Sequence, residues 1–226
     1  MKKNNLDIQT LEVGGIYPAI FAMRNPMSSW EKSDSHKCDQ HCNNTEQCKS
    51  YGQICIGKED LKLSQKLTRA GSEHCKHLRM IEVWVNMTMP RYWWVEFDTY
   101  KHTEKLSTST MHTIYKGELK TDHFYLGDII IPRVYDVLLD TVSTINILIE
   151  RYNTDKKYNH IRLIKRILPE SFLQMRTVKV NYAQLMNIYN QRKNHRLKEE
   201  WGLFCEWCES LPLFYELCIG IDLTND

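Results

Sequence analysis

The feature that most constrains the fold is a stretch of strict alternation that ends at Pro90. From residue 81 to residue 86 the side chains run Ile, Glu, Val, Trp, Val, Asn. Successive side chains of a strand point to opposite faces of its sheet, so the pattern predicts a strand with one buried face. Proline is well tolerated in the first turn of a helix, and we therefore expect a short helix from Pro90 to about Tyr100.

Helical patterns and further strands are expected on both sides of this strand. Apolar residues recur at roughly helical spacing between Glu59 and Arg79. The remaining expected elements are helices over 125–152 (interrupted near Pro132), 157–168, 182–209 (broken near Asn194) and from 211 onward, strands over 11–23 and 175–180, and a loop over 101–112. Helices and strands that mix along the chain in this way predict an α+β fold.

Length and charge narrow the class of protein. The 226 residues, 42% of them hydrophobic, are enough for one domain with a sizeable core, so we expect a single domain over 1–226. Thirty basic and 28 acidic side chains nearly cancel, which gives no reason to expect a nucleic-acid or membrane partner. No apolar run is long enough to span a bilayer and no apolar stretch follows the basic start. We expect a cytoplasmic protein with reduced thiols.

A group of cations and amides lies between residues 165 and 192. Lys165 and Arg166 occupy the last turn of an expected helix before Leu168-Pro169, and Arg192 lies on the next long helix with Asn181 at its start and Asn187 within it. Fixed cations and amides at a junction between a strand and a helix suit a phosphate and an amide-bearing ring. The alternative is a basic face exposed to water.

The same segment resembles the C-terminal half of the flavin-dependent thymidylate synthases (ThyX). The matching residues are Ile167-Leu168-Pro169, Val180-Asn181, Leu185-Met186-Asn187 and Arg192. Upstream, Thr99-Tyr100-Lys101, seven residues and Ser109 stand where that family has Arg-His-Arg, seven residues and Ser, and Glu73-His74 and Ala22-Met23-Arg24 resemble a Glu-His pair and an Ala-Ala-Arg triplet. The resemblance covers roughly residues 15–30 and 70–201, and it extends to ThyX-like proteins carried by phages and prophages.

The resemblance implies a ThyX-like fold, with a central, mostly antiparallel sheet flanked by long helices, and a site without a side-chain nucleophile. It implies FAD as cofactor, NADPH and methylenetetrahydrofolate as co-substrates, and a homotetramer whose sites are shared between subunits. Residues implied to bind the nucleotide are Glu96, Ser109, Lys165 and Arg192. Those implied to bind the flavin are His74, Tyr100, Lys101, Asn181, Asn187 and Arg196. No catalytic side chain and no metal are expected.

Several positions depart from the family pattern. Glu96 stands where the family has a glutamine facing the base, and an ionised carboxylate accepts hydrogen bonds only. Cytosine offers an amine donor there, so the expected reaction is dUMP methylation or a related modification of dUMP or dCMP at C5. Met111 replaces an arginine that helps to hold the phosphate, and Arg196 replaces a histidine. The alternative is a non-catalytic protein that binds nucleotides or a host partner on a ThyX-like scaffold.

Cysteines gather in two places. Cys38, Cys42, Cys48 and Cys55 lie in a polar, turn-rich loop or insertion over about 28–57, and their spacing does not fit familiar zinc sites, so we expect free thiols, with a zinc site as the alternative. Cys205 and Cys208 form a C-x-x-C within a helical pattern, which favours core packing over redox chemistry. Trp93-Trp94 is expected to pack in the core or at an interface, with stacking on a ligand ring as the alternative.

Overall fold

The computed structural model describes residues 1–37, 54–128 and 131–220. The chain divides into two compact units, each built from three stretches. The first unit comprises Met1–Gln9, Asn86–Lys101 and Lys105–Thr177, and the second takes the remainder. Because neither unit is a continuous stretch, the single domain expected over 1–226 stays a prediction. Within the described ranges, no helix combines the length and the apolarity needed to cross a bilayer.

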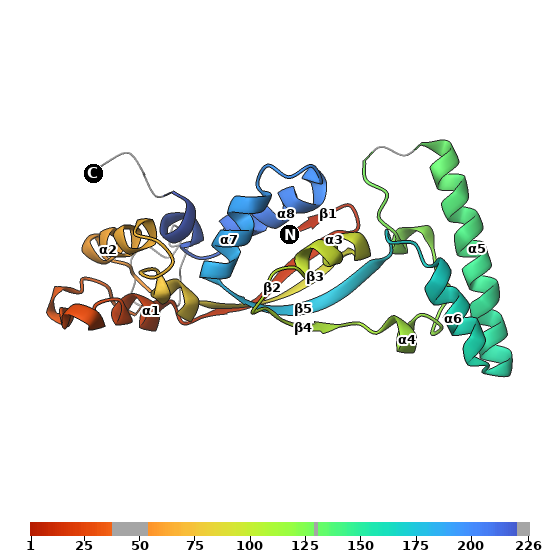
Figure 1. Ribbon diagram of the computed structural model, residues 1–226, viewed down its shortest axis with the longest axis horizontal. Coiled ribbons are helices and arrows are strands. Elements are labelled where there is room, and N and C mark those ends of the chain that lie inside the picture. The colour runs from red at the N-terminus through yellow and green to blue at the C-terminus, as the bar shows by residue number, and fades with distance from the viewer. Residues whose placement is uncertain (38–53, 129–130, 221–226) are drawn as a thin grey trace. The chain divides into compact units, whose positions relative to one another are not determined.

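A sheet of five strands is found among the described residues, with the order β1-β2-β3-β5-β4. The strands are β1 (Lys2–Lys3), β2 (Leu6–Gly14), β3 (Glu82–Pro90), β4 (Glu104–Ser107) and β5 (Leu173–Asn181). β1 and β2 are antiparallel, and β5 runs antiparallel to β3 because Tyr182 N donates to Ile81 O and Thr177 Oγ1 donates to Asn86 Oδ1. The expected α+β class is confirmed (Figure 1).

The alternation in β3 is realised as predicted. Val83, Val85, Met87 and Met89 have no exposed surface, whereas the side chains between them are partly exposed. One face of the strand therefore packs into the core. The helix expected after Pro90 is α3 (Arg91–Phe97), and Pro90 lies at its N-cap with an extended backbone.

In the first unit, two helices pack side by side, α5 (Pro132–Asp155) and α6 (Tyr158–Ile167) (Figure 1). Their shared core contains apolar side chains from both helices and from the residues that directly follow α6 and the short α4 (Thr110–Thr113): Ile114, Leu138, Val142, Ile145, Leu148, Ile149, Tyr152, Ile161, Ile164 and Leu168. The expected start of the first helix at 125 is wrong. Tyr125 N instead donates to Ser171 O at 2.8 Å, and α5 begins at Pro132, whose fixed φ suits a first turn.

In the second unit the strand prediction over 11–23 is only partly right. β2 ends at Gly14, and residues 16–22 form the helix α1 (Ile16–Ala22). Gly15 makes the break, because its φ is 85° and a Cβ there would lie 2.3 Å from the carbonyl oxygen of Met80. A short run of apolar residues fits a buried strand or a helix equally well, which explains the error.

The second unit also contains α2 (Lys58–Arg69), α7 (Tyr182–Arg192), α8 (Lys198–Ser210) and a π-helix over Tyr215–Ile219. The helix expected over 59–79 therefore ends early, and Lys76–Met80 is a separate 3-10 helix. The break expected near Asn194 is confirmed between α7 and α8. Aromatic side chains with almost no exposed surface form the core: Tyr182, Trp201, Phe204, Trp207 and Phe214.

The start of α2 is held by carboxylates from the preceding segment. Asp34 accepts hydrogen bonds from the backbone N–H groups of Glu59 and Asp60 at 2.9 and 3.0 Å, which satisfies donors that the helix itself leaves open. The Asp60 side chain is fully buried and pairs with the buried Arg24, with 2.6 Å between Arg24 Nε and Asp60 Oδ1. The Arg24 of the Ala-Met-Arg triplet thus has a structural partner within its own unit.

Candidate functional site

Lys165 and Ser109, two of the residues predicted to bind a nucleotide, lie close together in the first unit. Lys165 occupies the last turn of α6, and its ammonium donates to Thr110 Oγ1 at 2.5 Å. Thr110 is buried, and Ser109 directly before it is exposed and is the N-cap residue of α4. The Ser109 side chain makes no capping hydrogen bond, and the hydroxyl that meets the ammonium is that of Thr110. The structure thus brings a hydroxyl and an ammonium to one place.

The loop that carries Ser109 is fixed by β5. Thr108 N donates to Met175 O at 3.0 Å, and Gln174 Nε2 donates to Thr108 O at 2.7 Å. The expected loop over 101–112 therefore contains regular structure, namely β4 and the start of α4. Because both of these hydrogen bonds join Thr108 to β5, the position of Ser109 is set by the sheet rather than by a free loop.

Arg91 is a further cation near Lys165, and the sequence did not reveal this proximity. Burial lowers the pKa of Lys165, and the nearby guanidinium of Arg91 lowers it further. Arg91 is the first residue of α3, and its Nη2 lies 3.1 Å from Glu170 Oε1. The proline before it signalled a helix start, but nothing in the sequence signalled that this helix start meets the end of α6.

Glu96, Tyr100 and Lys101 cluster at the C-terminal end of α3. Glu96 is half-buried, Tyr100 is half-buried with its ring edge-on to Phe97 at 6.2 Å between centroids, and Lys101 is exposed. Thr99 turns its hydroxyl back to its own helix, where it donates to Glu96 O at 2.7 Å. Thr99 therefore presents no hydroxyl hydrogen to a ligand in this conformation.

Asp98 anchors α3 to two strands. Its carboxylate is 2.9 Å from Lys105 Nζ and accepts bonds from Arg176 Nη1 at 3.0 Å on both oxygens. Burial alone would raise the pKa of Asp98, but the hydrogen bonds from these two cations hold it below its ordinary value. Arg176 also lies over the Trp94 ring at 4.4 Å, and Lys105 over Phe97 at 5.5 Å. These charges position the helix and leave Asp98 no role as a base.

Trp93 and Trp94 are core residues. Both have no exposed surface, and Trp93 stacks on Phe97 with 5.0 Å between centroids. Trp94 Nε1 donates to Gln174 O at 2.9 Å. The core-packing interpretation of this pair is therefore confirmed, and stacking of either ring on a ligand would require α3 to unpack.

The remaining predicted residues belong to the second unit. Asn181 is the N-cap residue of α7, and it exchanges hydrogen bonds of 3.0 Å with Gln184 in a capping box. The cap uses the side-chain oxygen of Asn181, so the amide nitrogen is the group that it can offer to a ligand. Asn187 is exposed, and its oxygen accepts a bond from Gln191 Nε2 at 3.0 Å.

Arg192, in the last turn of α7, lies over the Trp201 ring with 4.5 Å from its guanidinium carbon to the ring centroid. Stacking of this kind orients the planar guanidinium while its edge keeps its donors. Arg196 and His74 are exposed. Of the residues predicted in this unit, Asn181 and Arg192 lie at the two ends of α7, Asn187 lies in its middle, and His74 lies in a turn.

The cysteines show no sign of chemistry in the described residues. Burial raises the pKa of Cys205 to about 11 and raises those of Cys208 and Cys218 well above their ordinary value. Such thiols stay protonated at neutral pH, which agrees with core packing of the C-x-x-C pair. The backbone of Cys55 forms an isolated antiparallel bridge with that of His36, whereas Cys38, Cys42 and Cys48 lie outside the described residues. In the described part of the chain no group of three His, Cys, Asp or Glu could hold a metal.

A cavity of about 860 Å³ lies along α5 in the first unit. It is lined by residues 117–121 and by side chains of α5 that include Asn146 and Asn153. None of the predicted nucleotide or flavin residues lines it. Asn146 exchanges hydrogen bonds with the backbone of Leu119 at 2.8 and 2.9 Å, so the polar groups of this cavity serve to hold the loop.

Comparison with known proteins shows the fold. No protein-family model matches the sequence, and no curated protein matches it. Among solved structures, the chain is similar to a crystal structure of the flavin-dependent thymidylate synthase ThyX from Helicobacter pylori complexed with FAD and dUMP, with a TM-score of 0.70 and 16% identity over 95% of this chain and 99% of that one. A second structure of ThyX from the same organism with FAD and dUMP also has a TM-score of 0.70 at 16% identity, over 97% and 100% of the two chains. The chain therefore has the ThyX fold.

Proposed function

We propose that this protein is a flavin-dependent enzyme that transfers a one-carbon unit to C5 of a pyrimidine deoxynucleoside monophosphate. The observation that carries the proposal is the convergence of Lys165, Ser109 and Thr110 in a chain with the ThyX fold. A half-buried ammonium bonded to Thr110, with the exposed Ser109 as the preceding residue, suits a phosphate dianion. The similar structures hold dUMP and FAD, which makes these two molecules the first to test.

In this proposal the nucleotide is held at three points. Lys165 and Ser109 bind the phosphate, Arg192 binds the phosphate or sugar, and Glu96 faces the base. Arg192 is suited to the role because its stacking on Trp201 fixes the plane of its donors before a ligand arrives. Glu96 in its ionised form prefers a base that offers a donor, which favours cytosine over uracil at this position.

The residues proposed for the flavin fit that cofactor by their chemistry. Tyr100 has a partly exposed ring that can stack on a flat tricycle, and Lys101 and Arg196 are exposed cations that suit a diphosphate. His74, Asn187 and the amide nitrogen of Asn181 can donate to ring oxygens and nitrogens. When bound and reduced, FAD supplies a hydride, with NADPH as its reductant and methylenetetrahydrofolate as the one-carbon donor.

The chain itself then contributes positioning and electrostatics. No side-chain nucleophile is required, and Asp98, the carboxylate nearest to Glu96 in sequence, is tied to Lys105 and Arg176. Lys165 and Ser109 fix the phosphate, and that anchor sets the distance from the base to Tyr100. Holding the reactants in a fixed geometry makes a reaction between separate molecules effectively intramolecular.

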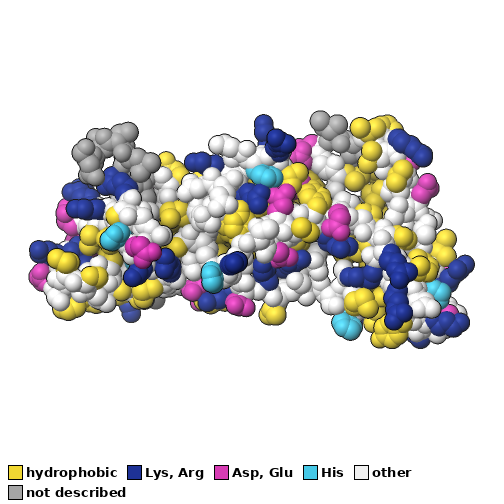
Figure 2. Space-filling model, in the orientation of Figure 1, with side chains coloured by type: hydrophobic (Ala, Val, Ile, Leu, Met, Phe, Trp, Pro, Cys, Tyr) yellow, Lys and Arg dark blue, Asp and Glu magenta, His cyan; other side chains and the backbone are white. Residues whose placement is uncertain are grey.

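Assembly and origin belong to the same proposal. The resemblance to ThyX implies a homotetramer, and exposed apolar side chains gather over the N-terminal part of α5 (Figure 2), including Ile131, Val134 and Val137. A surface of that kind is typical of contacts between subunits. We also expect a cytoplasmic protein of the divergent type found in phages.

A second candidate function is binding of nucleotides without catalysis. It is favoured by the hydroxyl of Thr99, which is turned to its own helix rather than outward, at the first position of the triplet where the family has Arg-His-Arg. A scaffold that kept the phosphate site and lost the flavin would bind nucleotides or a host partner only. This candidate and the enzyme differ in one property, the retention of flavin.

The test is the visible absorption spectrum of the purified protein before and after incubation with FAD. The enzyme proposal predicts a flavin spectrum, with release of FAD on denaturation and identification by mass spectrometry. Protein that stays colourless after incubation, yet binds dUMP or dCMP in a calorimeter, would favour the binding protein. A direct comparison of dUMP with dCMP in that calorimeter tests the role given to Glu96, because much tighter binding of dUMP would contradict it.

A further inference from the structure

We infer that Arg91 is the second cation of the phosphate subsite and takes over the role that an arginine at position 111 has in the family that this chain resembles. The inference rests on the proposed nucleotide-binding function. It adds a residue that neither the sequence pattern nor the resemblance indicates. Arg91 lies at the start of α3, whereas the other members of the subsite lie on α4 and α6.

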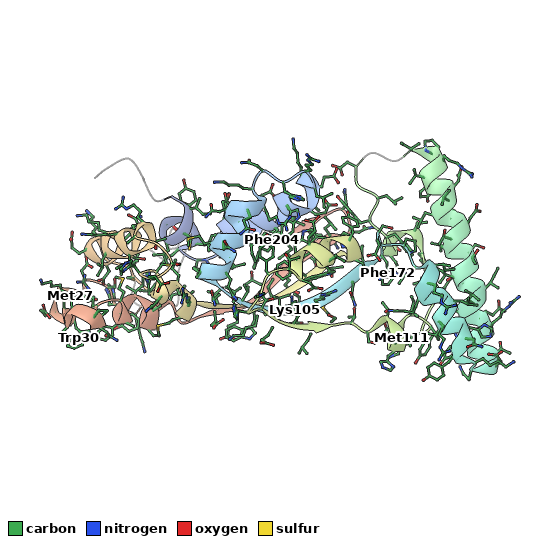
Figure 3. All side chains as sticks on the ribbon, viewed as in Figure 1. Met27, Trp30, Lys105, Met111, Phe172 and Phe204 are labelled. Carbon is green, nitrogen blue, oxygen red and sulfur yellow. The ribbon has the colours of Figure 1, made fainter. Side chains whose placement is uncertain are left out.

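The backbone of Arg91 is fixed where α6 ends. Arg91 N donates to Phe172 O at 3.1 Å, and Tyr92 N donates to Glu170 O at 3.2 Å. Residues 170–172 follow Lys165 by only a few positions, so these two bonds hold the first turn of α3 against the segment that leaves α6. Figure 3 labels Phe172 in this segment and Met111 on α4.

Two cations are therefore held near each other in the first unit. The ammonium of Lys165 is half-buried, and its hydrogen-bond partner is the neutral hydroxyl of Thr110. Among the described residues no carboxylate lies within 4 Å of it. Burial lowers the pKa of Lys165, and the charge of the Arg91 guanidinium lowers it further, in line with the backbone bonds that bring the start of α3 to residues 170–172. Like charges kept close without a shared counter-ion favour the binding of a dianion between them.

The ion pair with Glu170 uses only part of the hydrogen-bonding capacity of the Arg91 guanidinium. The ion pair joins Arg91 Nη2 to Glu170 Oε1 at 3.1 Å, and a guanidinium has five N–H donors in all. The Glu170 side chain is 56% exposed and that of Arg91 only 27%. An exposed carboxylate of this kind stabilises little, so it can be displaced by a phosphate or can share the guanidinium with it.

Position 111 explains why a second cation is required. Met111 is exposed on α4, directly after Thr110, and brings no charge. The phosphate of a nucleoside monophosphate carries nearly two charges at neutral pH, and within the first unit Lys165 alone balances only one of them. Arg91 restores the missing charge from a different helix.

The experiment measures binding of dUMP, dCMP and the parent nucleosides to four forms of the full chain: wild type, Arg91→Gln, Glu170→Gln and the double variant Arg91→Gln/Met111→Arg. Arg91→Gln is expected to weaken nucleotide binding by about tenfold to a hundredfold, the usual effect of losing one charge-assisted contact. Nucleoside binding is expected to stay the same. Met111→Arg is expected to recover most of the lost affinity, and Glu170→Gln to leave nucleotide affinity unchanged or increased.

Glu170→Gln is the control for a purely structural role. If Arg91 served only to hold the 170–172 segment, Glu170→Gln and Arg91→Gln would weaken nucleotide binding to the same extent, and that result would overturn the inference. Equal weakening of nucleotide and nucleoside by Arg91→Gln would do so too. Far-ultraviolet circular dichroism and the unfolding midpoint show whether each variant is folded.

A probe without a base separates this inference from the proposed function. Inorganic phosphate is expected to raise the unfolding temperature of the wild type and to lose this effect in Arg91→Gln. If wild-type protein binds neither dUMP nor dCMP, the proposed function fails, while a phosphate effect that depends on Arg91 still supports the subsite. A phosphate effect of the same size in both proteins would refute the role of Arg91 itself.

Discussion

Replacement of Arg24 by methionine is predicted to destabilise the second unit strongly and in a pH-dependent way. The Asp60 side chain has no exposed surface, and its Oδ1 lies 2.6 Å from both Nε and Nη2 of Arg24. Asp60 Oδ2 accepts bonds from Ser33 Oγ at 2.7 Å and from Ser35 N at 3.1 Å. Methionine preserves most of the side-chain volume but leaves a buried carboxylate without its cation.

The magnitude follows from these contacts. Breaking a buried ion pair by removing one partner costs about 3–5 kcal/mol, because the remaining charge stays buried. The two hydrogen bonds from Arg24 to a charged acceptor, at about 1.5–3 kcal/mol each, give a range that overlaps it. Lys62→Met is the matched control, because Lys62 lies on α2, the helix that carries Asp60. The Lys62 ammonium is 2.9 Å from Glu59, both side chains are mostly exposed, and the expected loss is at most about 0.5 kcal/mol.

The pH dependence gives the sharper test. Burial alone would raise the pKa of Asp60, but its hydrogen bonds and the charge of Arg24 lower it below the ordinary 3.8. In wild type this contribution to stability is present above the unfolded pKa and is lost as the pH falls through the lowered folded value. In Arg24→Met burial dominates and the folded pKa rises, so the carboxyl is protonated as the pH falls towards about 4 and the penalty shrinks.

The assay is urea unfolding of wild type, Arg24→Met and Lys62→Met at neutral pH and near pH 4, followed by tryptophan fluorescence. The difference between wild type and Arg24→Met should be several kcal/mol at neutral pH and clearly smaller near pH 4. A difference of less than about 1 kcal/mol at neutral pH, or one that is the same at both values, would refute the reasoning.

Three further predictions concern the proposed site and the thiols. Lys165→Met should weaken the binding of a nucleoside monophosphate by at least tenfold and change nucleoside binding little, since a charge-assisted contact to phosphate is lost. Because the pKa of Lys165 is lowered, the affinity of the wild type should decline with rising pH before the range in which an ordinary lysine titrates. Calorimetry across pH checks both, and equal losses for nucleotide and nucleoside would argue against a phosphate contact. Glu96→Gln should shift preference from dCMP towards dUMP by about tenfold, measured as a ratio of the two affinities, and an unchanged ratio would remove Glu96 from base recognition. Because burial raises the pKa of both thiols, Cys205 and Cys208 should resist alkylation at neutral pH in the folded protein and react once it is unfolded. Peptide mass spectrometry measures the labelling, and rapid labelling of either thiol in the folded state would contradict their core role.

The sequence predicted the elements whose pattern is local. The alternation over β3 and the helix over 157–168, found at Tyr158–Ile167, depend on side chains within one element. The break near Asn194 was visible for the same reason. The helix at Ile16–Ala22 was missed because its direction depends on Gly15 passing close to Met80, a contact far along the chain.

The candidate site divides in the same way. Lys165 and Ser109 were found through a spaced pattern and a resemblance, and the structure shows them near each other through Thr110. The role that we infer for Arg91 was not visible in the sequence, because the backbone bonds from Arg91 to Phe172 and from Tyr92 to Glu170 join segments distant in sequence. Asn181 was predicted as a flavin ligand, and that role stays a prediction. In the structure it is also the N-cap residue of α7.

The division of the chain into two units, each assembled from three separated stretches, has a consequence for how such a protein can diversify. A continuous domain can be copied, lost or exchanged by one recombination event, but no single crossover can transfer either of these units whole. Substitution within an intact chain does not meet this obstacle, and the exchange of a charge that we infer between positions 91 and 111 is a change of this kind. The two units are therefore inherited together, in a chain that is only 16% identical in sequence to structures that share its fold.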